Sequence, residues 1–146
     1  MKADILVHFA GVEPGVMPRY HPGDEVTFAV GIQVDSDVTA SDVAIQLRWR
    51  TEGPGNTNQH AVGEERLGQQ LLMAIDTVTH RASFRLPEQG PISHESKYVT
   101  IVWEVHVTLD IPWKIDPKHS EPLLVVPTPH GYLPEASDSP APPVLP

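Results

Sequence analysis

The segment Tyr98–Ile111 constrains the fold of this chain most strongly, because its apolar residues recur at every second position. One set of positions is apolar throughout: Val99, Ile101, Trp103, Val105, Val107, Leu109 and Ile111. The intervening set is mostly polar: Tyr98, Thr100, Val102, Glu104, His106, Thr108 and Asp110. Side chains on a strand point alternately to opposite faces. The segment is therefore predicted to be a long β-strand with one face on a core and the other facing water.

Two earlier segments alternate in the same way. Glu25–Asp35 places these residues on one face: Val26, Phe28, Val30, Ile32 and Val34. Ala40–Arg50 does the same with Val43, Ile45, Leu47 and Trp49. Trp49 and Trp103 are predicted to be large core anchors. Gly31, inside the first of these strands, predicts a bulge or a close approach of another backbone.

Shorter strands are predicted on either side of these segments. They cover Ala3–Ala10, Val78–Leu86 and Pro122–Val126, and Leu67–Ile75 is assigned to a strand by its context. Turns rich in glycine and proline separate them, and no segment has the periodicity of a helix. Roughly six to eight short strands of this kind indicate an all-β fold, an antiparallel β-sandwich that is immunoglobulin-like in the broad sense.

The chain length and the proline distribution predict the domain organisation. A chain of 146 residues corresponds to about one domain and can bury a core without disulfides. From Pro127 onward the sequence is rich in Pro, Ser and Ala, a composition that does not bury enough apolar surface to fold. We therefore expect a β-sandwich domain over residues 1–126 and a Pro-rich flexible tail over residues 127–146, with its binding role left open.

Composition and charge exclude several classes of partner. The chain has no cysteine, which rules out disulfides and thiolate metal sites, and its formal net charge is −9. Its ten Lys and Arg residues form no basic run, so nucleic acid is not an expected partner. No window is apolar enough for a membrane helix, and we predict no membrane insertion and a cytoplasmic protein.

The sequence predicts no catalytic residue, no cofactor and no metal ligand, and hence no enzyme. None of the eight histidines stands in an H-x-x-x-H or HExxH pattern. No serine occupies a G-x-S-x-G context. A small surface site of His80, Glu104 and His106 would require their strands to pair. The alternative is that Glu104 and His106 belong to a solvated polar face.

Five residues are candidates for protein binding: Arg48, Arg50, Arg81, Arg85 and Trp113. The four arginines are predicted on outward faces. On neighbouring strands they would form a basic patch for an acidic partner, and otherwise they would pair with nearby Glu and Asp. Trp113 lies in a turn after Pro112. It either folds back over an end of the sandwich, which we favour, or stands exposed as an anchor for a partner.

The order of several landmarks resembles the N-terminal domain of the arrestin family. A turn of the form Tyr20-x-Pro-Gly-Asp-Glu leads into the Glu25–Asp35 strand, and Phe84-Arg-Leu-Pro87 ends another strand. The long Val99–Val105 pattern follows, and Glu121-Pro122 opens a short last strand. The resemblance covers residues 1–126 and implies a single-domain, non-catalytic interaction module. We match no residues of the charged polar core of arrestins, so phosphate sensing and receptor binding are not inferred.

These observations favour an adaptor or scaffold that binds another protein, of unknown identity, through sheet edges or loop tips. A structural subunit, or a homo-oligomer that buries one sheet face, is the first alternative. A small metal-binding protein or enzyme that uses surface histidines is the second.

Overall fold

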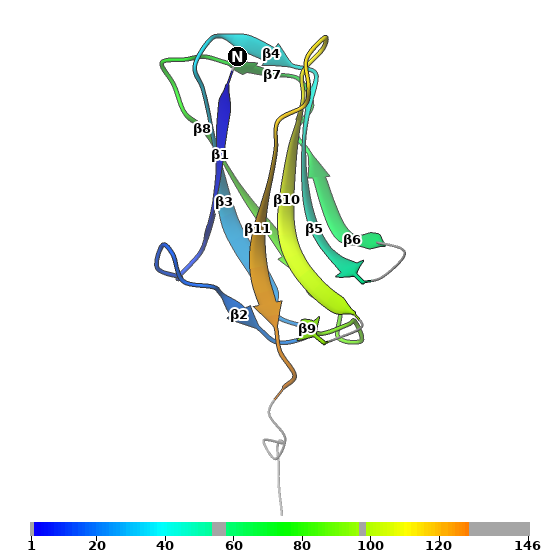
Figure 1. The fold of residues 1–146 in the computed structure, drawn as a ribbon. Coiled ribbons are helices and arrows are strands. Elements are labelled where there is room, and N and C mark those ends of the chain that lie inside the picture. Colours follow the sequence, from blue (N-terminus) through cyan, green and yellow to red (C-terminus); the bar gives the residue numbers. More distant parts are fainter. Residues whose placement is uncertain (1, 54–57, 97–98, 129–146) are drawn as a thin grey trace, which may run out of the picture.

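The computed structural model describes residues 2–53, 58–96 and 99–128, and all regular structure within them is β-strand (Figure 1). The larger sheet has the order β2 (Arg19–Tyr20), β11 (Lys118–Val125), β10 (Thr100–Asp110), β5 (Asp42–Glu52) and β6 (Gln59–Arg66), with β9 (His94–Glu95) beside the start of β10. The smaller sheet has the order β1 (Ala3–Phe9), β3 (Glu25–Val34) and β8 (Val78–Arg85). A third pair consists of β4 (Val38–Ala40) and β7 (Gln70–Leu72).

The two main sheets form the layers of a β-sandwich, as the alternating patterns predict. Figure 1 shows β1, β3 and β8 behind the larger sheet, with β4 and β7 across one end and β2 and β9 at the other. Every pairing is antiparallel except the short parallel contact between β2 and β11. The inward residues predicted on β3 are all buried: Val26, Phe28, Val30, Ile32 and Val34. The predicted all-β fold class is therefore confirmed.

Strand β10 lies at the centre of the larger sheet, between β5 and β11. Its predicted inward face is buried from Trp103 to Ile111, and the Trp103 indole is 1% exposed. The indole Nε1 donates a hydrogen bond of 2.9 Å to the carbonyl oxygen of Pro91, which satisfies the polar edge of this large core residue. Val99, at the end of the predicted strand, is 37% exposed because the strand begins only at Thr100.

Trp49 was predicted as the second core anchor, but it is only half-buried. It lies at the β5–β6 side of the larger sheet, where its ring stacks on that of His60 with 4.6 Å between centroids. A bulge between Leu47 and Arg48 shifts the β5–β6 register just before Trp49. The residue therefore packs at the sheet margin, and Phe28 is the other large aromatic group that is fully buried.

The glycine that allows a close approach is Gly63, and the expectation for Gly31 was wrong. Gly31 pairs regularly with Leu6 and Thr79, and a Cβ there would meet only Thr77 at an ordinary 3.9 Å. A Cβ on Gly63 of β6 would lie 2.5 Å from the ring of Phe84 on β8. Gly63 thus lets the two sheets approach each other along one side of the sandwich.

The last strand is longer than predicted, because Pro122 lies inside β11 instead of starting it. The N–H groups of Leu124 and Val126 bond to Pro18 and Tyr20, on the side away from β10. By the alternation of a strand, the nitrogen of Pro122 also faces that side. β2 covers only the end of β11, so at Pro122 this side of β11 is a free edge of the sheet. A proline at that position therefore removes no hydrogen bond to β10.

Three other predictions differ from the structure or fall outside it. The predicted strand Leu67–Ile75 is reduced to β7, while the segment before it, for which no strand was predicted, forms β6. Residues 54–57, between β5 and β6, lie outside the described residues. Of the expected tail, residues 127 and 128 follow β11, and residues 129–146 lie outside the described part of the chain. The structure contains no helix, within the described ranges, that could span a membrane.

Replacement of Trp103 by Ala is expected to destabilise the fold by about 3–5 kcal/mol, because it leaves a cavity and removes the bond to Pro91. Chemical denaturation would measure this change. Trp113→Ala is the matched control. Trp113 is 101% exposed, so its loss should leave the free energy of unfolding within about 0.5 kcal/mol. Equal effects of the two substitutions would contradict the assignment of Trp103 as the core anchor.

Gly63→Ala is expected to destabilise the fold by about 1–3 kcal/mol, because its Cβ would overlap the Phe84 ring and force the sheets apart. Gly31→Ala is the control, since that Cβ meets no atom closer than 3.9 Å. It should be neutral or slightly stabilising. Thermal unfolding of both variants, and of Gly63→Ala combined with Phe84→Leu, tests the contact. The double variant should recover part of the loss.

Candidate interaction surfaces

The four predicted arginines do not form one patch, because their strands belong to different sheets. Arg48 and Arg50 lie on β5 of the larger sheet, whereas Arg81 and Arg85 lie on β8 of the smaller one. Arg85 Nη1 donates a 2.7 Å hydrogen bond to the carbonyl of Gly23. Arg81 is exposed, opposite Ala29 of β3. The condition for a joint basic patch, that β5 and β8 be neighbours, is not met.

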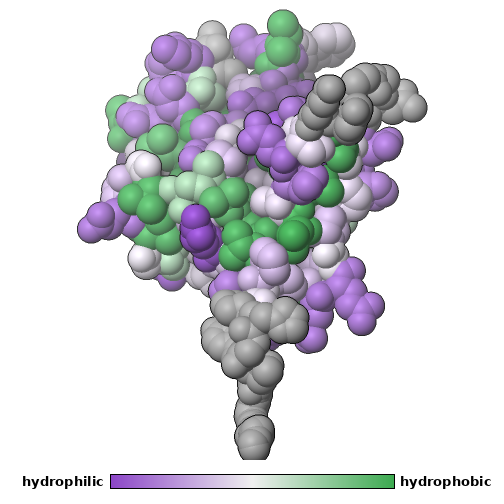
Figure 2. All heavy atoms as spheres, turned by 60° about the horizontal axis from the view of Figure 1, so that its bottom comes forward, coloured by the Kyte–Doolittle hydropathy of each residue, from purple (hydrophilic) through white to green (hydrophobic). Residues whose placement is uncertain are grey.

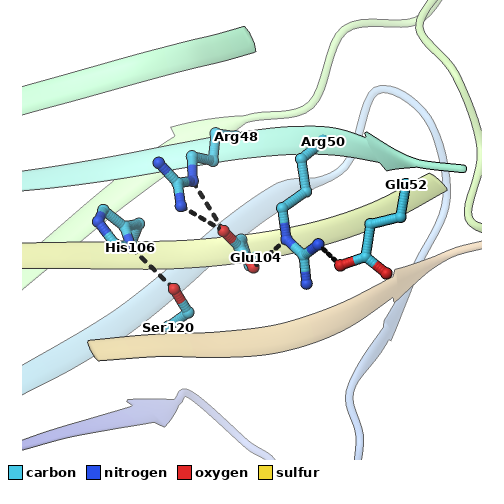
Figure 3. A network of polar contacts seen from close by, with 6 residues as sticks. All are labelled: Arg48, Arg50, Glu52, Glu104, His106 and Ser120. Atoms are coloured by element: carbon cyan, nitrogen blue, oxygen red, sulfur yellow. Dashed lines mark hydrogen bonds and ion pairs between the residues drawn. The ribbon is translucent and has the colours of Figure 1, made fainter. Parts of the chain in front are cut away.

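Arg48 and Arg50 instead surround a carboxylate on the outer face of the larger sheet (Figure 3). Both Nε and Nη2 of Arg48 lie 2.7 Å from Glu104 Oε2, and Arg50 Nε lies 3.2 Å from Oε1. Arg50 also pairs with Glu52. Glu104 is only 3% exposed, although it points away from the core. We call Arg48, Arg50, Glu52 and Glu104 the ion-pair cluster.

The ion-pair cluster has little charge left for a partner. Its two guanidinium groups face two carboxylates, and Arg48 retains only 13% of its side-chain exposure. A pair this buried depends on its mutual hydrogen bonds to offset desolvation. The cluster is therefore a structural element of the outer face. The prediction that Glu104 belongs to a solvated polar face was wrong, because the two arginines cover its carboxylate.

A polar cavity of about 380 Å³ lies beside the cluster on the same face. Asp42, Gln46, Arg66, His106, Asp116 and Lys118 line part of it. His106 Nδ1 lies 2.7 Å from the Ser120 hydroxyl. Partial burial, and then the positive charge of Arg48, lower the pKa of His106. Asp42 and Arg66 are paired at 2.6 Å, so the cavity carries opposite charges already matched to each other.

The histidines do not gather into a metal site in the part of the chain that the structure describes. His80 does not face His106, because β8 pairs with β3; its Nε2 lies 2.7 Å from Glu65 on β6 instead. His119 Nε2 similarly lies 2.9 Å from Glu121. No group of three or more potential metal ligands occurs among the described residues.

Strand β1 forms an edge of the smaller sheet. It pairs only with β3, and the bonds at Lys2 and Ala10 show that its even-numbered residues face that partner. The N–H and C=O groups of Ile5 and Val7 therefore point away from the sheet. Between them the side chain of Leu6 is 71% exposed. Such an edge can accept another strand.

Two apolar features mark opposite ends of β10 and β11. Trp113, in the turn between these strands, is 101% exposed, so the expectation that it folds back over the sandwich was wrong. At the other end an apolar groove of about 270 Å³ is lined in part by Met17, Glu95, Ile101, Val102, Pro122 and Leu124. Figure 2 shows apolar surface (green) exposed around that end of the molecule.

Sequence reasoning missed both the groove and the free edge. The groove combines residues from the loop before β2, from β9, and from β10 and β11, and no local pattern brings these together. Met17 lies in a segment read only as a turn-rich loop. In β1 the consecutive residues Ile5, Leu6 and Val7 are all apolar. They place apolar side chains on both faces of the strand, so the sequence pattern gave no indication that this strand forms an edge.

The comparisons with known proteins agree with this fold. The sequence model of the family described as "Arrestin (or S-antigen), N-terminal domain" matches residues 55–130, a little more than half of the chain. The chain therefore belongs to the arrestin N-terminal domain family, a fold that supports protein interaction in general.

A solved structure gives the same result for the fold. Spo0M, the sporulation control protein of Bacillus subtilis, aligns with a TM-score of 0.65 and 19% identity. The alignment covers 84% of this chain and 49% of Spo0M, so this chain spans about half the length of that protein. No curated protein sequence matches the chain.

Glu104→Leu is expected to destabilise the fold by about 3–5 kcal/mol, because it leaves the largely buried Arg48 guanidinium without a carboxylate and leaves Arg50 only its pair with Glu52. Combining Glu104→Leu with Arg48→Met and Arg50→Met also removes the guanidinium groups that had lost Glu104. The triple variant should recover most of the lost free energy of unfolding. Urea unfolding of the single and triple variants measures both values. A single variant as stable as the original chain would show that the ion-pair cluster contributes nothing.

Proposed function

We propose that this chain is a non-enzymatic adaptor that binds an extended segment of another protein along the free edge of β1. The observation that carries the proposal is the row of outward N–H and C=O groups at Ile5 and Val7. A partner strand would satisfy these groups with main-chain hydrogen bonds. The exposed side chain of Leu6 would add an apolar contact that discriminates among partners.

The other candidate surfaces are less suited than the β1 edge to binding a protein partner. The charges of the ion-pair cluster, and those of Asp42 and Arg66 in the polar cavity, are paired within the chain, so they offer little to an incoming acidic or basic partner. For the same reason, an oligomer that buries the outer face of the larger sheet would have to desolvate these ion pairs. The β1 edge carries no such penalty, because its backbone groups gain partners on binding.

Membership of the arrestin N-terminal domain family is consistent with an adaptor, and we propose that the sandwich domain spans residues 1–126. Spo0M is a sporulation control protein, which fits a regulatory role for this fold. The absence of cysteine suits a reducing compartment, and we therefore place the adaptor in the cytoplasm.

Substitution of Val7 by Pro tests the edge directly. Proline removes one outward N–H donor while leaving the β1–β3 hydrogen bonds in place. We expect a partner captured from the native host to lose affinity about tenfold or more, measured by titration with the purified partner.

Val7→Ala is the matched control, since it shortens the same side chain but keeps the N–H donor. It should bind within about twofold of the original chain. Thermal unfolding verifies that both variants fold. A partner that binds Val7→Pro and Val7→Ala equally well uses another surface, and the proposal would then fail.

A further inference from the structure

The turn between β10 and β11 presents an unusually exposed apolar tip. Trp113 is 101% exposed and Ile115 is 95% exposed, with Lys114 between them. Both residues belong to the short connection between β10 and β11, at one end of the sandwich (Figure 1). Large aromatic side chains dominate the binding energy of many interfaces. We call residues 113–115 the Trp113 tip.

A tight turn fixes the backbone of the Trp113 tip. Trp113 has φ of 66°, the one positive value of a non-glycine residue in the described part of the chain. It is the third residue of a turn that begins at Ile111 and is closed by the bond from Lys114 N–H to the Ile111 carbonyl, and a turn with proline at its second position commonly has a positive φ at its third. The Asp116 carboxylate, which accepts a 3.2 Å bond from Ile111 N–H, further stabilises the turn. The turn therefore holds Trp113 in one place at the end of the sandwich.

A receptor for such a tip lies at the opposite end of the same two strands. The apolar groove begins where β10 starts, at Ile101 and Val102, and where β11 ends, at Leu124. Its volume of about 270 Å³ is below the range of about 300–1,000 Å³ that is usual for small-molecule sites. It suits one aromatic side chain with a few neighbouring atoms.

The charges at the two ends are complementary. Exposed Lys114 belongs to the Trp113 tip, while Glu95 lines the groove. Glu121 lines a second, smaller hollow that shares Met17 and Pro122 with the groove. A lysine beside the inserted indole would therefore meet carboxylates at the groove.

We propose that the groove receives the Trp113 tip of a second copy of this chain. Two antiparallel copies could each place a tip in the other's groove, but this two-fold dimer would bury the outer faces of the larger sheets and desolvate their ion-pair clusters. We therefore expect a single, heterologous contact, which leaves a free tip on one copy and a free groove on the other. Further copies can add head to tail. This differs from an oligomer that buries a sheet face.

The main competitor for the groove is the segment 129–146 of the same chain, which follows β11 closely in sequence. That segment contains Tyr132 and Leu133 as apolar candidates. Its only Asp and Glu residues are Glu135 and Asp138, and it has no Lys or Arg. Glu95 would repel these acidic groups, whereas it attracts Lys114. Charge complementarity therefore favours the second copy.

Sedimentation velocity of the full chain over about 10 μM to 1 mM tests the proposal. A contact made by a single loop buries less area than a stable interface. We therefore expect weak self-association, in which the average sedimentation coefficient rises with concentration and no single oligomer dominates. Trp113→Ala should weaken the association about 30-fold. Leu124→Lys should do the same by placing a positive charge in the groove opposite Lys114.

A mixing experiment tests whether the tip of one copy occupies the groove of another, and growth of the original chain beyond a dimer distinguishes the head-to-tail contact from a two-fold one. Trp113→Ala retains its groove, and Leu124→Lys retains its Trp113 tip. Each variant alone should be monomeric, whereas an equimolar mixture should form a dimer and nothing larger. Ile75→Ala is the control, because Ile75 is an equally exposed apolar residue at 87%, and it should associate like the original chain.

Two results would overturn the proposal: an original chain that stays monomeric throughout, or variants whose mixture forms no dimer. Met17→Lys, at an exposed loop position that also lines the groove, replaces Leu124→Lys in the mixture if that variant fails to fold cooperatively. A spin label on Ser137→Cys identifies the competitor, since the chain has no other cysteine. If the spin label broadens the NMR signals of the groove residues to the same extent at every protein concentration, segment 129–146 of the same chain occupies the groove and the proposal fails.

Discussion

The packing of two alternating faces against each other is the interaction on which the rest of this structure depends. β3 contributes a continuous apolar row from one sheet, and β10 contributes Trp103 and the residues after it from the other. Because the side-chain period of a strand is two, a slip of one residue in β10 would move Glu104 and His106 into the core. The cost of burying those groups fixes the register, and the β5 and β11 pairings follow from it.

The outer face of β10 shows that facing away from a core is not the same as facing water. Glu104 lies on that side, yet Arg48 and Arg50 cover it almost completely. The long arginine stems lie along the sheet and bring their charged groups over the carboxylate. The ion-pair cluster also divides this face. A polar cavity lies toward the end of the sheet where β10 finishes, and an apolar groove lies toward the end where β10 begins.

Surfaces available to partners therefore lie at the margins of the sandwich. The β1 edge offers unpaired backbone groups, and the two ends of β10 and β11 offer an exposed tryptophan and an apolar groove. On the opposite side, Gly63 and the His80–Glu65 contact bring β6 close to β8. β1 also approaches β11, so the two sheets come close to each other along both sides of the sandwich.

The alternation of Tyr98–Ile111 and Glu25–Asp35 was sufficient to determine these two long strands and most of their inward residues, and the succession of short strands between turns indicated the sandwich class. The two strands and their inward residues depend only on side-chain direction along one strand. The sequence could not determine which strands become neighbours. The arginines of β5 and β8 were therefore placed in one conditional patch, and Gly31 was chosen where Gly63 makes the close approach. The burial of Glu104, the free edge of β1 and the groove exist only after distant segments pack together. Tertiary structure alone decided them, because each one is a relation between strands and not a property of one.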